Sequence, residues 1–259
     1  MLKRKIGLFA AFIAASAGVA IAQAEPPAPT AATVPAPVAT GWKSSAAAGL
    51  TLTRGNSDTT LATLRATTTK KWEQNELTLT ADGAYGLSKV DGKTSQTADS
   101  IHGFVQYNRL FNERLYGYLR AEGLHDEIAA VRYRFTLAPG AGYYFIKEKK
   151  MDLCGEVGPG YVYERLGNAN DSFVTLRFAD KFHRELSDRA RVWQTAEWLP
   201  QADKLDNYVI NAETGIEADL TADKKLSLRA LLQDSYSSQP ASGREKNDAK
   251  IVTAIAYKF

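Results

Sequence analysis

The feature that most constrains this chain is a two-residue alternation of apolar and polar side chains that continues to its last residue. In the final segment, Ile251, Thr253, Ile255, Tyr257 and Phe259 share one face. Successive side chains of a β-strand point to opposite faces, so such alternation indicates a strand whose two faces meet different surroundings. The segment predicts a terminal strand that ends in an aromatic residue and closes a sheet against the first strand.

From residue 42 onward we count twelve alternating segments separated by turn-like clusters. Many reach ten residues or more, whereas strands usually have about 5 to 6 residues and a tilted membrane-crossing strand needs about 9 to 11. The connections are expected to alternate between tight turns on one side, as at 72–76, 111–114, 147–150, 184–188 and 221–225, and generally longer loops on the other, as at 90–99 and 237–247. The first turn on the loop side, at 55–58, is a short exception, and 167–171 is expected to form a loop. The prediction is an all-β fold: a transmembrane, antiparallel, up-and-down β-barrel of about 12 strands.

Aromatic residues gather where these strands would cross the two membrane interfaces. One predicted girdle, near the tight turns, contains Trp42, Trp72, Tyr107, Phe145, Phe182 and Tyr257. The other, near the longer loops, contains Tyr85, Tyr133, Tyr163, Trp198, Tyr208 and Tyr236.

The first residues read as a secretory signal. Three basic residues at 3–5 precede an uncharged apolar run to Ile21, and Ala22-Gln23-Ala24 forms a small-x-small cleavage site. We therefore expect a signal peptide over 1–24, a Pro/Ala-rich disordered leader over 25–41 and one barrel domain over 42–259. An uncleaved anchor helix is the alternative, but the apolar run is short for a span of about 20 residues.

Composition excludes several classes of protein. Cleavage would remove three of the 32 Lys and Arg residues and none of the 29 Asp and Glu residues, leaving a formally neutral chain without a basic block for nucleic acid. Cys154 is the only cysteine, so it cannot form an internal disulfide; we expect it to be packed inside. No segment after residue 24 approaches 18 consecutive apolar residues, which excludes a helical membrane protein.

The polar face of the predicted strands carries both signs of charge in similar number. The predicted lumen-lining charges are Arg65, Asp82, Arg120, Glu122, Arg134, Glu156, Arg177, Arg191, Glu197, Glu213, Glu217, Arg229 and Lys250. They are compatible with a water-filled passage that selects small solutes, and equally with a lattice of ion pairs that closes the lumen. Eight strands give a filled interior and about 16 to 18 an open porin, so twelve strands leave both readings open.

Catalytic and metal motifs are weak. His125-Asp126-Glu127 falls at a predicted external rim, where a base and its orienting acid could act, but no serine stands in a nucleophile context. The sequence has no HExxH, no paired cysteines, no phosphate loop and no EF-hand spacing. We therefore predict that the protein is not an enzyme and uses no cofactor or metal.

The turn sequence GLTLTRGNSDTT at 49–60 and the terminal IAYKF at 255–259 make the chain similar to the YdiY-like family of salt-induced outer-membrane proteins. This resemblance covers roughly residues 42 to 259. It implies a Gram-negative outer-membrane barrel without assigned catalytic residues, a link to osmotic or salt stress, and contact with outer-membrane lipids. Tyr257 and Phe259 would form the terminal signal read by the barrel-assembly machinery.

Together these features predict a narrow, weakly selective outer-membrane channel for small polar solutes or ions. A closed barrel that stabilises the envelope is the main alternative. An outer-membrane hydrolase and a soluble periplasmic β-sheet binding protein are less favoured.

Overall fold

The computed structural model describes residues 41–53, 57–90 and 93–259, and its regular structure is entirely β-strand. The predicted signal peptide and all but the last residue of the predicted leader lie outside the described residues. The strands are β1 (Trp42–Thr53), β2 (Ser57–Trp72), β3 (Asn75–Val90), β4 (Lys93–Leu110), β5 (Leu115–Asp126), β6 (Val131–Lys147), β7 (Met151–Leu166), β8 (Ala169–Glu185), β9 (Ala190–Gln201), β10 (Lys204–Asp219), β11 (Leu226–Ser237) and β12 (Asn247–Lys258).

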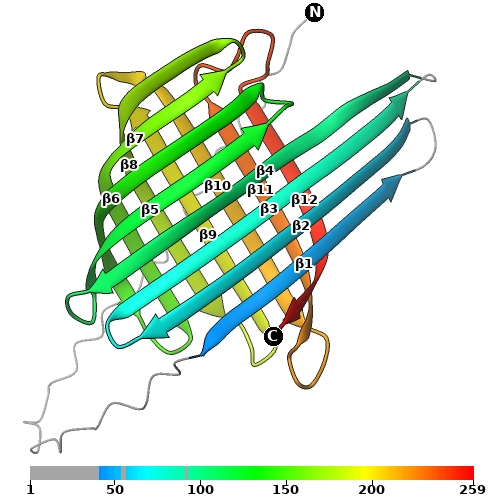
Figure 1. Cartoon of the computed structure of the whole chain (residues 1–259). Helices are drawn as coiled ribbons and strands as arrows, with labels where there is room; N and C mark the ends of the chain where they lie inside the picture. Colours follow the sequence, from blue (N-terminus) through cyan, green and yellow to red (C-terminus); the bar gives the residue numbers. More distant parts are fainter. Residues whose placement is uncertain (1–40, 54–56, 91–92) are drawn as a thin grey trace, which may run out of the picture. The chain divides into compact units, whose positions relative to one another are not determined.

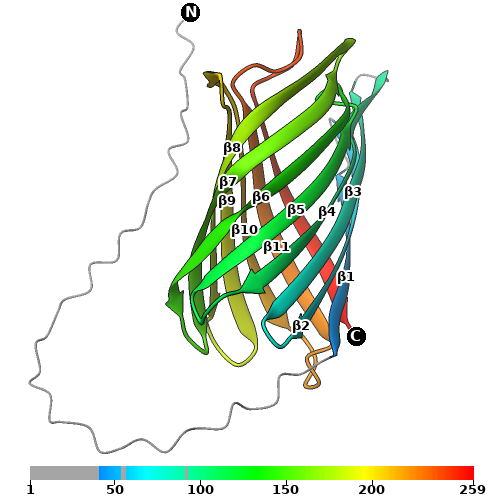
Figure 2. The same ribbon diagram turned by 60° about the vertical axis from the view of Figure 1, so that its left-hand side comes forward.

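The strands form one closed antiparallel barrel. Each strand pairs with its neighbours in sequence, and β12 returns to pair with β1 (Figures 1 and 2). Among the described residues, no helix has the length and apolar character needed to cross a membrane. The prediction of an up-and-down barrel, with a terminal strand that closes against the first, is confirmed.

The barrel turns its large apolar side chains outward. Leu79, Leu137 and Ile255 are 37%, 50% and 46% exposed, whereas Tyr116 and Ala256 on the inner face are at most 1% exposed. A soluble β-sandwich would pack such residues between its sheets. The inverted distribution is that of a barrel whose outer face contacts hydrocarbon.

The two ends of the barrel differ less than the sequence predicts. We call the end that holds Trp42 and Phe259 the terminal end, and the other the loop end. At the loop end, connections of two residues join β3 to β4, β7 to β8, and β9 to β10, and only the β11–β12 connection is long. The expectation of a longer loop at 90–99 is therefore wrong, because β4 already begins at Lys93. The loop expected at 167–171 is reduced to two residues, because β8 begins at Ala169.

The β3–β4 hairpin is longer than predicted because alternation marks only the part of a strand whose two faces meet different surroundings. Ser88 pairs with Ser95, and Lys89 with Thr94, in a regular hairpin ladder. Where a strand projects beyond the membrane, water wets both faces, so the ladder continues although apolar and polar residues no longer alternate. Alternation therefore does not predict the strand residues of this hairpin.

Aromatic rings contact one another at both predicted girdles. Near the terminal end, Tyr257 and Phe259 stack with ring centroids 6.3 Å apart. Toward the loop end, Tyr133 stacks on Tyr163 at 5.6 Å and Tyr208 on Tyr236 at 5.9 Å. Rings of this kind are stable at the boundary between hydrocarbon and water.

Glycines on the inner face make room for large inward-facing rings. A Cβ placed on Gly142 would lie 2.2 Å from Cζ of Tyr116, and one on Gly215 would lie 2.2 Å from the indole of Trp193. Because no side chain fills these positions, both rings can lie flat against the wall. The barrel wall is thus complementary in shape to the rings of Tyr116 and Trp193 at Gly142 and Gly215.

This match predicts that Gly142→Ala destabilises the barrel. The added methyl group would overlap the buried ring of Tyr116, and overpacking of this kind costs about 1 to 3 kcal/mol. The free energy of unfolding of the protein refolded into lipid vesicles should fall by that amount. Gly41→Ala is the matched control, since nothing lies within 4 Å of its added Cβ; an equal loss in both variants would contradict the packing argument.

Candidate functional site

The barrel encloses an elongated cavity of about 740 Å³. Glu76 and His183 line it near the terminal end, and Leu166 and Arg244 line it near the loop end. Such a volume is that of a pocket for one small molecule, although the cavity extends between the two ends. Side chains therefore fill most of the interior and leave a narrow space.

The predicted lumen charges lie around this space. Twelve of the thirteen line the cavity: Arg65, Asp82, Arg120, Glu122, Arg134, Arg177, Arg191, Glu197, Glu213, Glu217, Arg229 and Lys250. The thirteenth, Glu156, lies behind them with a side chain that is 0% exposed.

Glu156 is the most enclosed charge of the lumen. One carboxylate oxygen accepts a hydrogen bond from Arg177 at 2.8 Å, and the other accepts from Lys181 at 2.6 Å. The hydroxyl of Tyr116 and the amide of Gln106 also donate to it, at 2.8 and 2.9 Å. A carboxylate removed from water needs such a complete set of donors. These contacts join β4, β5, β7 and β8 across the interior.

Arg177 extends this cluster to β9. Its side chain is 3% exposed, and its Nε donates to Glu197 at 2.5 Å. Its Nη1 also donates to the hydroxyl of Tyr118 at 3.1 Å. The guanidinium therefore bridges two carboxylates, which holds it in place at the edge of the cavity.

A second run of charges lies on β3, β4 and β5. Arg120 binds Glu122 at 2.6 Å and lies over the ring of Phe104, 3.7 Å from its centroid. The ring of His102 lies between two carboxylates, with Nε2 3.2 Å from Glu122 and Nδ1 3.1 Å from Asp82. These residues are partly exposed, so this part of the network faces the cavity.

The run ends in a bridge across the lumen. Arg65 on β2 contacts Asp82 at 3.5 Å and Glu213 on β10 at 2.7 Å. Three strands, β1, β12 and β11, separate β2 from β10 in the sheet, so this ion pair spans the interior instead of following the wall. Trp193 and Gln233 also donate to Glu213, at 2.9 and 2.8 Å. We call this contact the Arg65–Glu213 bridge.

A third cluster fixes the last strand near the terminal end. Glu217, whose side chain is 1% exposed, receives hydrogen bonds from Arg191 and Arg229 and contacts Lys258 at 2.7 Å. Lys258 also binds Asp219 at 2.5 Å. These contacts tie β12 to β10 from inside the lumen, next to the outward-facing Tyr257 of the predicted assembly signal.

Some residues of the network are absent from the predicted set. Glu164, which binds Arg134 at 2.5 Å, continues the inward face of β7 and could be found by extending that alternation. His102 was missed because Gly103 and Phe104 interrupt the pattern of β4. Lys181 follows Arg177 on the inward face, but its sequence context gives no sign that Glu156 is its partner.

The histidine at the loop end does not form a base and acid pair. Nδ1 of His125 lies 2.8 Å from the backbone oxygen of Arg132. Asp126 instead accepts a hydrogen bond from the backbone of Ala129 at 2.8 Å and caps the following turn. Both side chains thus have local structural roles.

Cys154 is buried and lies 3.5 Å from the hydroxyl of Tyr116. Among the residues that the structure describes, no group of three or more His, Cys, Asp or Glu side chains could hold a metal ion.

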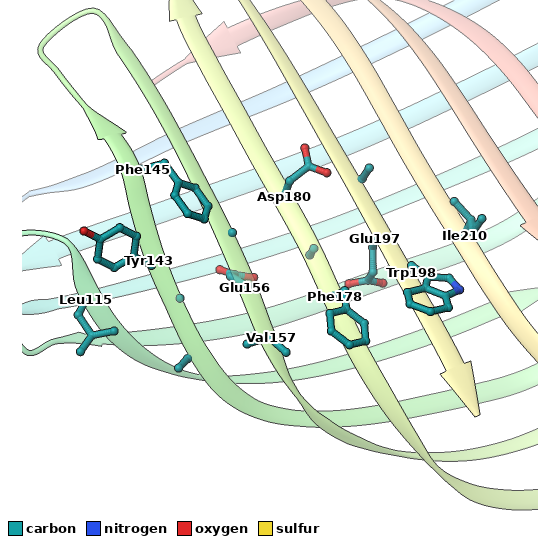
Figure 3. A pocket seen from close by; sticks show the side chains of 15 residues that line it. Leu115, Tyr143, Phe145, Glu156, Val157, Phe178, Asp180, Glu197, Trp198 and Ile210 are labelled. Atoms are coloured by element: carbon teal, nitrogen blue, oxygen red, sulfur yellow. The ribbon is translucent and has the colours of Figure 1, made fainter. Parts of the chain in front are cut away.

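The outer face carries a groove of about 630 Å³, shown in Figure 3. Its apolar lining is formed by Leu115, Tyr143, Phe145, Val157, Phe178, Trp198 and Ile210. Asp180 opposes Gly155 and Ala196 in the ladder and, by strand alternation, shares this face with Phe178. Asp180 is charged, unlike the apolar residues around it, and it lies two residues from Phe182 of the predicted aromatic girdle near the tight turns.

A closed antiparallel barrel with an apolar exterior and a charged lumen defines an outer-membrane-type β-barrel protein. More narrowly, the chain belongs to the family described as "Protein of unknown function, DUF481", whose model matches residues 46–259. No curated protein matches it significantly.

Solved structures with the same fold include an outer membrane channel from Pseudomonas putida F1, with a TM-score of 0.51 and 9% sequence identity, covering 90% of this chain and 100% of that chain. The translocator domain of the autotransporter NalP from Neisseria meningitidis has a TM-score of 0.49 and 16% identity, covering 86% of this chain and 90% of that one. At 9% identity, the likeness to the Pseudomonas putida channel is one of fold alone.

The Glu156 cluster predicts that Glu156→Gln destabilises the barrel. The substitution keeps the shape but leaves Lys181 without its carboxylate and Arg177 with only one, and unpairing a buried charge costs about 3 to 5 kcal/mol. A loss at or below the lower limit is expected, because Arg177 keeps Glu197 and the side chain of Lys181 is 34% exposed. Unfolding in vesicles measures it, with exposed Glu185→Gln as the control. If Glu156→Gln were as stable as the original protein, the view that the Glu156 carboxylate stabilises the barrel by pairing these charges would be contradicted.

Proposed function

We propose that the protein is a narrow, weakly selective channel for small polar solutes or ions in the outer membrane of a Gram-negative cell. The observation that carries this proposal is the cavity lined by residues from both ends of the barrel. Charges of both signs line it, and several remain in contact with solvent, including Arg65 and Asp82 at 22% and 26% exposed. A wetted passage with fixed charges of both signs admits small polar solutes without strong preference for one sign of ion.

The side chains that cross the lumen make the passage narrow. The Arg65–Glu213 bridge and the contact between Gln106 on β4 and Glu156 on β7 both cross between strands that are not neighbours. These crossing contacts favour water and small ions over larger solutes.

The same contacts support the second candidate function, a closed barrel that stabilises the envelope. If the crossing side chains leave no continuous path for water, the barrel conducts nothing and acts through its rigidity alone. A role in osmotic or salt stress, which the resemblance to YdiY-like proteins implies, fits either candidate. Membership of the DUF481 family does not by itself distinguish the two candidate functions.

Bilayer recordings separate the two candidates. We expect small, stable unit conductance from the purified protein, and a larger conductance from the double variant Arg65→Ala, Glu213→Ala, because it removes the bridge that crosses the lumen. The double variant Lys150→Ala, Asp188→Ala removes an ion pair of exposed side chains and should leave the conductance unchanged. Silent membranes with all three proteins would favour the closed barrel.

The proposed location predicts how the protein behaves in cell fractions and gels. We expect it in the outer-membrane fraction, where the closed barrel should resist detergent, so unboiled samples should migrate differently from boiled ones. Export through a cleaved signal predicts that the mature chain begins at Glu25, which amino-terminal sequencing checks. Recovery in the soluble periplasmic fraction would contradict the outer-membrane location.

A further inference from the structure

The join between β1 and β12 is the weakest in the barrel. Four residue pairs connect these strands, from Ser45 with Lys258 to Ala48 with Ile255. Two backbone hydrogen bonds between Ser44 and Phe259, of 3.2 and 3.0 Å, extend the join by one residue at the terminal end. Every other pair of neighbouring strands has at least nine paired residues among those described.

Toward the loop end the two strands separate (Figure 1). Continuing the same register would place Leu50 opposite Thr253 and Thr53 opposite Lys250, yet within the described residues the pairing stops at Ala48 and Ile255. The carbonyl oxygen of Thr253 instead lies so close to Gly49 that a Cβ there would approach it to 2.5 Å. The strands therefore leave the ladder where Gly49 permits a close crossing.

The unpaired edges lie within the apolar band. Outward-facing Leu50 and Ile251 flank the separation and are 64% and 73% exposed. Beyond Ala48, β1 pairs only with β2, and β12 pairs only with β11. Backbone groups without partners are costly in hydrocarbon, so the separation must be wetted from the lumen or covered by a bound molecule.

The inner wall beside the separation differs from the rest of the lumen. It carries a cluster of buried apolar residues on β1, β11 and β12, against which Trp193 packs: Ala47, Leu231, Val252, Ala254 and Ala256. Three basic residues, Arg65, Arg229 and Lys250, line the cavity on the strands around this cluster. Glu213 and Glu217 pair with the two arginines, whereas Lys250 makes no ion pair within the part of the chain that the structure describes.

We propose that the separation between β1 and β12 is a lateral portal for a single-chain anionic amphiphile, a long-chain carboxylate. The carboxylate would bind Lys250 in the lumen. The hydrocarbon chain would lie against Trp193, which lines the cavity and packs on the buried apolar cluster, and would leave between Leu50 and Ile251 into the membrane. Charge complementarity selects the head group, and the indole of Trp193 selects the chain. This route is separate from axial conduction, so it stands or falls independently of the channel proposal.

The portal is tested by joining the two strands. In a Cys154→Ala background, the pair Leu50→Cys, Thr253→Cys lies at the first outward position beyond the paired region. The control pair Ala48→Cys, Ile255→Cys lies at the last paired position on the same face. A short bis-maleimide joins each pair, and the products are refolded into phosphatidylcholine vesicles.

Entry of the amphiphile is read from Trp193. With Trp42, Trp72 and Trp198 replaced by Phe, Trp193 is the only indole, and a dibrominated stearate in the vesicle membrane quenches it only by reaching the cavity that Trp193 lines. We expect quenching in the unjoined protein and in the joined control pair, and loss of quenching when Leu50→Cys and Thr253→Cys are joined. Quenching that survives this join would overturn the portal, as would linked dimers showing that a second copy covers the edge.

The head-group contact has its own test. Lys250→Gln should weaken binding of the dibrominated stearate about tenfold, the effect of losing one charge-assisted hydrogen bond, while leaving binding of its methyl ester unchanged. Lys149→Gln, in an exposed turn at the terminal end, is the matched control. Equal binding of acid and ester to the original protein would refute the role of Lys250.

Discussion

The structure depends on closing a sheet in a solvent that offers no hydrogen bonds. Backbone groups in hydrocarbon must find partners within the protein, and a barrel provides them only if its first and last strands join. Here that join is short, and side chains in the lumen support it. Lys258 on β12 contacts Glu217 and Asp219 on β10, which holds the last strand in place, and Arg229 on β11 donates to Ser45 on β1 at 3.3 Å, across the join.

The filling of the lumen is not explained by stability alone. Buried ion pairs contribute little net stability compared with apolar residues of the same volume, because desolvation offsets their attraction. An apolar core would hold the wall as well but would exclude water. Glu156 and the Arg65–Glu213 bridge instead keep the interior polar, and their own charges are paired. The network therefore permits a wetted space inside a wall that is only partly filled.

The sequence predicts the fold well because lipid and water impose different side chains on the two faces of each strand. That contrast alone assigns Arg177 and Glu217 to the inside of the barrel and Leu137 to the outside. The same reasoning fails for 93–99, because both faces of that hairpin meet water. It also fails for Asp180, which shares the outer face with Phe178.

Alternation reveals which face a residue occupies but not which residue lies across the barrel. The partner of Arg65 is Glu213, 148 positions later in the chain, and this pairing depends on the curvature of the whole sheet. The sequence also does not predict that the β1–β12 pairing stops at Ala48 and Ile255, because apolar and polar residues alternate normally in both strands beyond that point. That place is marked by a property of the closed barrel: charged residues fill the lumen nearly everywhere, but beside the join buried apolar residues pack under Trp193.

Where the inner side of the wall is apolar as well, next to strands that have lost their pairing, the wall no longer separates membrane from lumen as the rest of the barrel does. Conduction along the axis and passage through the wall would then rely on different residues of one structure.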